Sequence, residues 1–374
     1  MDKRPIMLAA GGTGGHLFPA FALAEELGRR GIPVELATDM RGDRYGTGFP
    51  ARKVHQIHSA TLGGRSPVAM AKTGWTLSRG VREAYALMGE VRPAVVVGFG
   101  GYPSFPPLLV ARMRGIPTLL HEQNAVLGRA NRMLAKRVSA IATSFPTVKH
   151  LDGQAAAKAV YTGNPVRDVV RAAATSYTIH EYATRHGPDF RLLVFGGSQG
   201  ARFFSDVMPK AISLLDESDR RRIAIVQQCR PEDVDATAAA YASDNVRAEL
   251  KPFFADLPEL MGKADLVIGR AGASTVAELT VIGRPSILVP LPHAIDNDQL
   301  NNAMRLAEAG AAWCVEQKDA TPERLSRNIA DCMADPSGAS HVAAAARGLG
   351  RPDAVERLAE LVIELAGTGQ AAGN

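Results

Sequence analysis

Two glycine-rich turns, each following a short apolar run, constrain the fold of this chain most. Gly11–Gly15 follows the run Ile6–Ala10, and Gly196–Gly200 follows Leu192–Phe195. The first glycines of the two turns stand 185 residues apart in a chain of 374. Short apolar runs bounded by Gly or Pro are typical of buried strands, and their alternation with helical patterns is typical of a parallel sheet. The sequence therefore predicts an α/β fold built from two similar halves.

Further apolar runs predict the other strands of each half, and the length also favours two domains. Turn residues and weak periodicity from Thr162 to Pro188 predict a linker, and we place the boundary near Asn164. The predicted domains are 1–164 and 165–350, and an amphipathic helix at 351–366 is expected to return to the first domain. The predicted strands are Ile6–Ala10, Val34–Ala37, Ala94–Val97, Thr118–His121, Leu192–Phe195, Ile223–Gln227, Leu266–Gly269 and Ser286–Val289.

Charge and cysteine content exclude several classes of protein. The 43 Lys and Arg residues exceed the 38 Asp and Glu residues by only five, without a run of like charges, which fits small anionic ligands or an anionic membrane surface better than nucleic acid. Three widely spaced cysteines form neither a zinc pattern nor a disulfide framework, which favours a reducing cytoplasm. Because no apolar run approaches about 20 residues and no signal peptide is evident, we expect at most a peripheral membrane association.

The first glycine-rich turn is a candidate phosphate site. A glycine turn between a strand and a helix lets backbone N–H groups approach an anion. No Gly-Lys-Ser/Thr follows, and Leu17 occupies the third glycine position of a dinucleotide fingerprint, so the turn is neither a P-loop nor a standard dinucleotide site. One residue still favours dinucleotide binding, because Asp39 could hold a ribose diol. Close packing without a ligand is the structural alternative.

His16 is a candidate general base. It ends the first turn, where a helix should begin, and the helix dipole there disfavours the imidazolium form. Sugar transfer to a hydroxyl needs a base, and a positioned one contributes roughly 10²- to 10⁴-fold in rate. The alternative is a capping or core histidine.

A second candidate site follows the strand that ends at Gly269. The segment from Arg270 to Glu278 opens a helix with small residues, and Glu278 could bind a ribose diol while Ser274 and Thr275 contact phosphate. Thr275 and Glu278 also fit a capping box, which stabilises a helix by about 1 kcal/mol without any ligand.

Other polar segments follow strands at the same predicted sheet edges, where ligands of parallel sheets bind. They are Gly98–Tyr102, His121–Asn124 and Pro290–Gln299. The pairs Asp296/Asp298 and Asp233/Asp235 resemble acidic pairs that hold Mg²⁺, although such pairs on loops are usually solvated.

The alternation of apolar and basic residues between Val68 and Arg82 is compatible with a membrane-facing helix. Its apolar residues could enter lipid while its basic residues meet anionic headgroups. A core-facing helix with a solvated basic face explains the pattern equally well. The residues are Val68, Met70, Lys72, Trp75, Leu77, Arg79 and Arg82.

Six motifs, taken in order, closely resemble the MurG family over nearly the whole chain. This family comprises the undecaprenyldiphospho-muramoylpentapeptide β-N-acetylglucosaminyltransferases. The motifs are Gly11–His16, Gly98–Tyr102, His121–Asn124, Gly163–Arg167, Gly196–Arg202 and Ala273–Glu278.

The resemblance implies a GT-B fold, with two Rossmann-like lobes whose parallel sheets face a central cleft. It implies inverting transfer of GlcNAc from UDP-GlcNAc to lipid I, which gives β-1,4-linked lipid II and UDP in peptidoglycan synthesis, and with it a part in cell shape and division. The C-terminal lobe would bind UDP-GlcNAc, and the N-terminal lobe would face the acceptor and the cytoplasmic side of the inner membrane. The resemblance implies no metal and no other cofactor. Other cell-wall synthesis proteins are candidate partners.

The resemblance also implies roles for individual residues. His16 remains the candidate base, and Gly101, Tyr102, His121 and Glu122 would lie on the acceptor side. Glu278 would bind the ribose, and Phe254 would lie beside the uracil. The residues expected to contact the donor are Thr13, Gly14, Gly15, Asn124, Arg167, Ser198, Phe254, Ala273, Ser274, Thr275, Val276, Ala277, Glu278 and Gln299.

Two other functions fit parts of this pattern. Another GT-B transferase that acts on a different lipid or small acceptor would share the donor lobe. A regulatory protein that keeps the two-lobed scaffold would bind UDP without consuming UDP-GlcNAc. The first-lobe motifs around Tyr102 and His121 argue against the former, and His16 with Glu278 argues against the latter.

Overall fold

The computed structural model divides the chain into two compact units. Unit 1 contains residues 1–167 and 351–374, and unit 2 contains residues 168–350. The predicted boundary after residue 164 lies three residues before the observed one. The structure describes residues 4–11, 14–39, 48–59, 67–177 and 189–371, with only the backbone described for 67–72, 198–201, 295 and 368–371.

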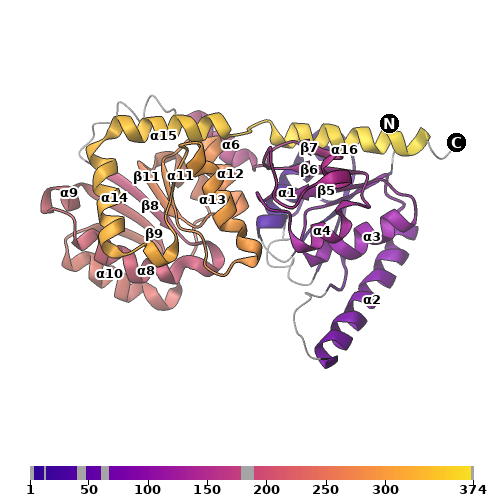
Figure 1. Cartoon of the computed structure of the whole chain (residues 1–374), viewed down its shortest axis with the longest axis horizontal. Helices are drawn as coiled ribbons and strands as arrows, with labels where there is room; N and C mark the ends of the chain where they lie inside the picture. The colour runs from indigo at the N-terminus through magenta and orange to yellow at the C-terminus, as the bar shows by residue number, and fades with distance from the viewer. Residues whose placement is uncertain (1–3, 12–13, 40–47, 60–66, 178–188, 372–374) are drawn as a thin grey trace. The chain divides into compact units, whose positions relative to one another are not determined.

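The described residues of unit 1 form a seven-stranded sheet in which every neighbouring pair is parallel (Figure 1). Its order is β3-β2-β1-β4-β5-β6-β7. Successive residues of the central strand point to opposite faces, because Ile6 and Leu8 join one core cluster whereas Met7 and Ala9 join another. The strands are β1 (Ile6–Ala9), β2 (Val34–Thr38), β3 (Lys53–Gln56), β4 (Val95–Gly98), β5 (Thr118–Glu122), β6 (Ala140–Thr143) and β7 (Ala159–Tyr161).

Helices cover both faces of this sheet. The cluster on one face includes residues of α1 and of the last helix, α16, while the cluster on the other face includes residues of α2, α3 and α4. Leu358, Ala359 and Val362 of α16 are fully buried in the first of these clusters, so the C-terminal helix completes the core of unit 1 (Figure 1). The helices are α1 (Gly14–Arg29), α2 (Pro67–Val91), η2 (Tyr102–Ser104), α3 (Phe105–Met113), α4 (Arg129–Ala135), α5 (Gly153–Ala156) and α16 (Ala354–Ala371).

The described residues of unit 2 repeat this plan with a six-stranded parallel sheet of order β10-β9-β8-β11-β12-β13. One core cluster joins its strands to α8, α10, α14 and α15. The prediction of two Rossmann-like α/β halves with parallel sheets is therefore confirmed. The strands are β8 (Phe190–Phe195), β9 (Ile223–Gln228), β10 (Arg247–Lys251), β11 (Leu266–Gly269), β12 (Ser286–Leu288) and β13 (Trp313–Cys314).

The helices of unit 2 lie between these strands in the sequence, except for α6, which precedes them, and η5, α14 and α15, which follow them. They are α6 (Asp168–Ser176), α8 (Gly197–Ser213), α9 (Glu217–Arg222), η3 (Pro231–Asp233), α10 (Val234–Ser243), α11 (Leu257–Lys263), α12 (Ala273–Ile282), η4 (Ile295–Asn297), α13 (Asp298–Glu308), η5 (Gln317–Asp319), α14 (Pro322–Ala334) and α15 (Pro336–Leu349).

The predicted linker is wrong over α6. Val170, Ala173 and Ala174 are buried on one side of this helix, which packs against α11 and α12 within unit 2. Its short apolar face of small residues gave a weak periodic signal. Residues 178–188 of the predicted linker lie outside the described part of the chain.

Both sheets have the strand order 3-2-1-4-5-6, extended by β7 in unit 1. In such sheets the connections reverse direction between the first and fourth strands, and ligands bind there beyond the carboxyl ends. The corresponding strands are β1 and β4 in unit 1, and β8 and β11 in unit 2. The helices that the structure describes include none that is both long and apolar enough to span a bilayer.

Candidate functional site

The carboxyl edge of the unit 1 sheet brings three of the predicted segments together. The turn after β1 leads into α1, which begins at Gly14, so His16 is the third residue of this helix as predicted. Gly14 and Gly15 are half-buried, and an added Cβ at Gly14 would lie 3.1 Å from the Phe18 ring. Thr13 lies outside the described residues.

The side chain of Gln123 lies between two histidines. Its Oε1 is 3.2 Å from Nδ1 of His16, and its Nε2 is 2.9 Å from Nδ1 of His121. His121 is fully buried, and burial lowers the pKa of its imidazole to about 4. Gln123 lies within the predicted segment His121–Asn124, but its role could not be predicted because its contact with His16 spans 107 residues of sequence.

The turn after β4 passes along the His16 ring. Gly100 and Gly101 have φ values of 86° and 69°, a region that favours glycine. An added Cβ at Gly101 would lie 3.2 Å from Cδ2 and 3.3 Å from Nε2 of His16. The half-buried Tyr102 begins η2 directly afterwards. The predicted acceptor-side residue Gly101 therefore adjoins the candidate base, and Tyr102 is the next residue along the chain.

Glu122 holds the loop that follows β5. Its Oε1 accepts from the backbone N–H of Asn124 at 3.0 Å, and its Oε2 accepts from the Gly128 N–H at 2.9 Å and from Asn131 Nδ2 at 2.7 Å. The carboxyl group is buried, and this burial raises its pKa although the hydrogen bonds oppose the change. Glu122 therefore fixes the backbone of the predicted donor residue Asn124.

Two other predicted residues lie in unit 1. The guanidinium carbon of Arg167 is 4.6 Å from the centre of the Phe18 ring on α1. Asp39 is buried after β2, and its Oδ1 lies 2.9 Å from where a Cβ of Gly11 would be. The close packing of Gly11 that the sequence offered as an alternative is thus present.

In unit 2, α12 begins where the second candidate site was predicted. Gly272 is its N-cap and the helix starts at Ala273, so Thr275 lies inside the first turn rather than at the cap. The predicted capping box of Thr275 and Glu278 is therefore wrong. Ser274 Oγ is buried and has no hydrogen-bond partner among the described residues, and Glu278 is 6% exposed. Ala273, Thr275 and Ala277 are half-buried, and Val276 is buried.

Arg270 is a buried cation next to this helix. Its Nη1 donates to the carbonyl oxygens of Val289 and Pro290 at 3.1 and 3.2 Å, and its Nη2 donates to Oε1 of Gln317 at 2.6 Å. Burial lowers the pKa of its guanidinium to about 10, so the group stays protonated at neutral pH. Arg270 was not predicted as a functional residue, although a cation directly after a buried strand is a signal visible in the sequence.

Gln299 is the second residue of α13, and its Oε1 accepts from the backbone N–H of Leu291, in the loop after β12, at 3.0 Å. Asp296 and Asp298 lie in η4 and at the start of α13, and burial raises the pKa of Asp298. The described residues contain no group of three or more His, Cys, Asp or Glu side chains suited to a metal ion. Of the other pair, Asp233 lies in η3 and Asp235 in α10.

The remaining donor residues lie near the ends of β8 and β10. Only the backbone of Ser198 is described, in the first turn of α8, after Gly197 with a φ of 67°. The ring of Phe254 is buried, with Nζ of Lys251 5.6 Å from its centre, whereas the adjacent Phe253 is 74% exposed.

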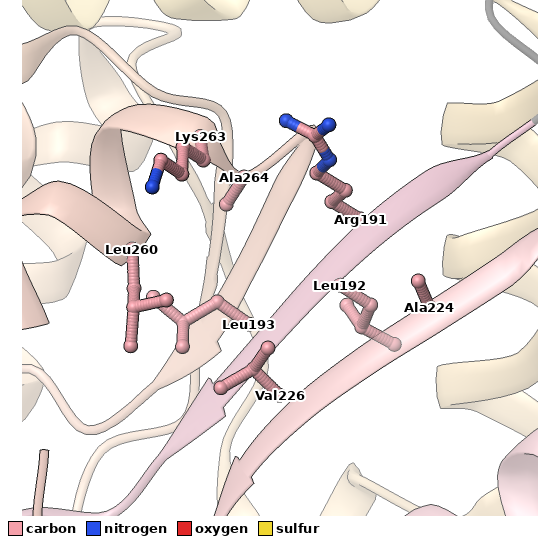
Figure 2. Close-up of a pocket in the computed structure, with 8 residues that line it drawn as sticks. All are labelled: Arg191, Leu192, Leu193, Ala224, Val226, Leu260, Lys263 and Ala264. Atoms are coloured by element: carbon pink, nitrogen blue, oxygen red, sulfur yellow. The ribbon is translucent and has the colours of Figure 1, made fainter. Parts of the chain in front are cut away.

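A cavity of about 210 Å³ lies elsewhere in unit 2 (Figure 2). Arg191 and Ala224 stand near the amino ends of β8 and β9, and Lys263 and Ala264 precede β11. The cavity therefore lies toward the edge of the sheet opposite to α12 and Arg270. Its aliphatic lining offers few polar groups for a nucleotide sugar.

Comparison with known proteins assigns the chain to a family. Residues 6–143 match the glycosyltransferase family 28 N-terminal domain, and residues 191–358 match its C-terminal domain. The UDP-N-acetylglucosamine–N-acetylmuramyl-(pentapeptide) pyrophosphoryl-undecaprenol N-acetylglucosamine transferase of Agrobacterium fabrum is 49% identical over 98% of this chain and 96% of its own length. The enzyme of the same name from Sinorhizobium fredii is 51% identical with the same coverage.

A solved structure gives the same result. The crystal structure of Acinetobacter baumannii MurG is similar with a TM-score of 0.78 and 29% sequence identity, covering 96% of this chain and 99% of that one. The sequence relatives at about half identity cover nearly the whole chain. The chain therefore belongs to the family 28 glycosyltransferases, among the UDP-N-acetylglucosamine–N-acetylmuramyl-(pentapeptide) pyrophosphoryl-undecaprenol N-acetylglucosamine transferases.

Proposed function

We propose that this protein transfers GlcNAc from UDP-GlcNAc to the MurNAc-pentapeptide of lipid I, with inversion at the anomeric carbon, giving β-1,4-linked lipid II and UDP. The observation that carries the proposal is the identity of 49 to 51% with the Agrobacterium and Sinorhizobium enzymes over 98% of the chain. The relatives' names state the donor and the undecaprenyl-linked acceptor. The place of His16 beside the predicted acceptor-side residue Gly101 supports the same chemistry.

Unit 2 supplies the groups that suit the donor. The backbone N–H groups that begin α12 and the cation of Arg270 favour the negative charge of a diphosphate. The buried Ser274 hydroxyl lacks a partner among the described residues and is available to a phosphate or sugar oxygen. The carboxylate of Glu278 suits a ribose diol.

The transfer step places the base in unit 1. The acceptor hydroxyl oxygen attacks the anomeric carbon while its proton passes to His16, and the bond between that carbon and the UDP oxygen breaks with its electron pair leaving on UDP. The buried Arg270 and the α12 N-terminus stabilise the departing diphosphate. We therefore expect the reaction to need no metal ion and no other cofactor.

We further propose that the protein acts peripherally at an anionic membrane surface on the cytoplasmic side. Trp75 on α2 is 70% exposed and Met113 on α3 is 66% exposed, whereas Ala84 and Met88 of α2 are buried in the core. Within the predicted stretch of α2, Trp75, Arg79 and Arg82 are exposed, whereas Leu77 is half-buried. Val68, Met70 and Lys72 belong to the stretch whose side chains are not described.

Vesicle flotation tests the membrane proposal. The wild-type protein should float with anionic vesicles and less with zwitterionic ones, and Trp75→Glu should weaken flotation at unchanged folding. Equal flotation of Trp75→Glu and wild type would contradict a contact through this face.

Release of UDP from UDP-GlcNAc with a lipid I analogue tests the enzymatic proposal, run with and without EDTA and alongside Glu278→Ala. We expect release that depends on the acceptor, survives EDTA, and requires higher donor concentration in the variant. Donor binding without release would contradict the proposal and favour a regulatory protein. Release with a different lipid or small acceptor only would favour another transferase of the same fold.

A further inference from the structure

A chain of hydrogen bonds leads from the candidate base into the core of unit 1. His16 Nδ1 contacts Gln123 Oε1, and Gln123 Nε2 contacts His121 Nδ1. The same Nε2 donates to the backbone carbonyl of His121 at 3.0 Å. At the far end, His121 Nε2 lies 3.2 Å from the carbonyl oxygen of Gly163. Both ends of the buried part of this chain thus contact a carbonyl oxygen, which can only accept.

These carbonyls decide where the protons lie. Because Gly163 O can only accept, Nε2 of His121 carries a proton, and burial keeps this ring neutral, so its Nδ1 is an acceptor. The Gln123 amide must then present its NH₂ group to His121, where it donates to both Nδ1 and the backbone oxygen. Its oxygen therefore faces His16, and the contact with His16 is a hydrogen bond only if Nδ1 of His16 donates.

We propose that Gln123 and His121 are positioning residues that hold His16 as the Nδ1–H tautomer and so leave the lone pair of Nε2 to take the acceptor's proton. The assignment of this proton transfer rests on the proposed function, whereas the tautomer does not. No proton moves along this series of hydrogen bonds, because each bond keeps the same donor and the same acceptor while His16 takes the proton of the hydroxyl. When Nε2 gains the proton, Nδ1 still donates to Gln123.

The turn of Gly100 and Gly101 supports this orientation. Nδ1 of His16 lies toward Gln123, while Nε2 and Cδ2 are the ring atoms nearest to the Cβ position of Gly101. A side chain at position 101 would crowd the edge of the ring that carries Nε2, because its Cβ would lie only 3.3 Å from that nitrogen. An acceptor hydroxyl approaching past Gly101 would therefore meet the unprotonated nitrogen.

The tautomer can be read without any substrate. Nitrogen NMR of ¹⁵N-histidine-labelled full-length protein, at alkaline pH where imidazole is neutral, separates protonated from unprotonated ring nitrogens. The signal of His16 is assigned among the nine histidines by its loss in His16→Gln. We expect Nδ1 of His16 to be protonated and Nε2 unprotonated, and Gln123→Leu to shift His16 toward the Nε2–H form. A wild-type His16 in the Nε2–H form would overturn the inference.

Kinetics then test whether the tautomer matters. Gln123→Leu should lower kcat about tenfold or more, because the wrong tautomer presents an N–H group to the acceptor, while KM for UDP-GlcNAc stays nearly constant. In a His16→Ala background, Gln123→Leu should cause no further loss, because the residue acts only through His16. Independent losses from the two changes would contradict a positioning role.

Thr118→Val is a matched control. Thr118 is fully buried on the same strand as His121, and its contacts are with Ser139 rather than with the histidines. This variant should lower stability without changing the His16 tautomer or kcat. If the wild-type protein shows the expected tautomer but fails to use the lipid I analogue, the proposed function fails and the tautomer stands. If it transfers GlcNAc with His16 in the Nε2–H form, only the positioning inference fails.

Discussion

The two units place opposite buried charges at equivalent edges of their sheets. In unit 1, the carboxyl group of Glu122 ends β5 and accepts hydrogen bonds at both oxygens from backbone and amide donors. In unit 2, Arg270 directly follows β11 and donates to two carbonyls and to Gln317. Among the described residues, Arg270 forms no ion pair with a carboxylate, and the rings of Phe203 and Phe204 lie 5.1 Å from its guanidinium carbon.

This difference separates two kinds of chemistry. An unneutralised buried cation beside a helix N-terminus favours an anion, which fits the diphosphate of a nucleotide sugar. In unit 1, the carboxyl group of Glu122 is occupied as an acceptor and the buried His121 is neutral, so neither side chain attracts an anion. The comparison therefore agrees with the proposal that unit 2 binds the diphosphate and unit 1 supplies the base.

Removal of the base should have the largest effect. His16→Ala should lower kcat roughly 10²- to 10⁴-fold, because the acceptor hydroxyl loses its proton acceptor. Equilibrium affinity for UDP-GlcNAc should change little, since the cation of unit 2 is untouched. His341→Ala, an exposed histidine on α15, is the control and should match wild type. Unchanged turnover in His16→Ala would end its role as the base.

Loss of the buried cation should come next. Arg270→Met keeps much of the side-chain volume but removes the donor from two buried carbonyls and from the half-buried Gln317, so unit 2 should lose about 3 to 5 kcal/mol of stability. Affinity for UDP should also fall and depend less on salt. Arg270→Lys keeps the charge and should retain more of that affinity. If UDP binds the Met variant as tightly as wild type, the cation does not contribute to anion binding.

Acid should destabilise unit 1 through His121. Its pKa is lowered from 6.5 to about 4 in the folded chain, so the unfolded chain binds a proton first as the pH falls. The contribution of neutral His121 to the free energy of unfolding is fully present above pH 6.5 and is lost as the pH falls to 4. At about 1.4 kcal/mol per pH unit, the total loss is about 3 kcal/mol. Hydrogen exchange of unit 1 peptides across this range should show the loss in wild type and a smaller one in His121→Gln. Identical pH dependence in both proteins would contradict it.

Neutralisation of the buried carboxyl should have the smallest of these effects. In Glu122→Gln, an NH₂ group replaces one carboxyl oxygen and faces N–H donors that it cannot accept from. We expect a loss of about 1 to 3 kcal/mol in the free energy of unfolding, partly offset by the removal of a buried charge. Faster hydrogen exchange in residues 123–131 should report it. Glu83→Gln, a partly exposed carboxylate bonded to Arg79 and His58, should cost less than about 1 kcal/mol. Equal losses of stability in Glu122→Gln and Glu83→Gln would contradict a larger structural role for the buried carboxyl group.

Much of the fold follows from the sequence, and most of the exceptions share a physical cause. All eight predicted strands are present with ends shifted by at most two residues. Five strands were missed. Of these, β3, β7 and β10 are largely exposed and β13 has only two residues, so they lack the apolar run that identified the others, whereas β6 is buried but consists mainly of small residues. They lie at or next to the ends of the sheets, where partner strands rather than burial define them.

The site was predictable as a set of positions but not as a set of contacts. Parallel strands bring their carboxyl ends to one edge, so His16, Tyr102 and His121 could be grouped from the motifs alone. The bond between Gln123 and His16 could not be predicted, because it depends on rotamers in segments 107 residues apart. The capping box failed because a Gly at position 272 caps α12 one turn earlier than the Thr275 pattern suggested.

The return of α16 to unit 1 has a consequence for biosynthesis. The apolar surface of α1 and the central strands is complete only when Leu358 and Val362 pack on it, and the 183 residues of unit 2 are translated before them. At about 5 to 20 residues per second, the ribosome needs roughly 10 to 40 s to make that stretch. During this interval the nascent first half carries an uncovered hydrophobic surface, whereas unit 2 emerges as one uninterrupted segment.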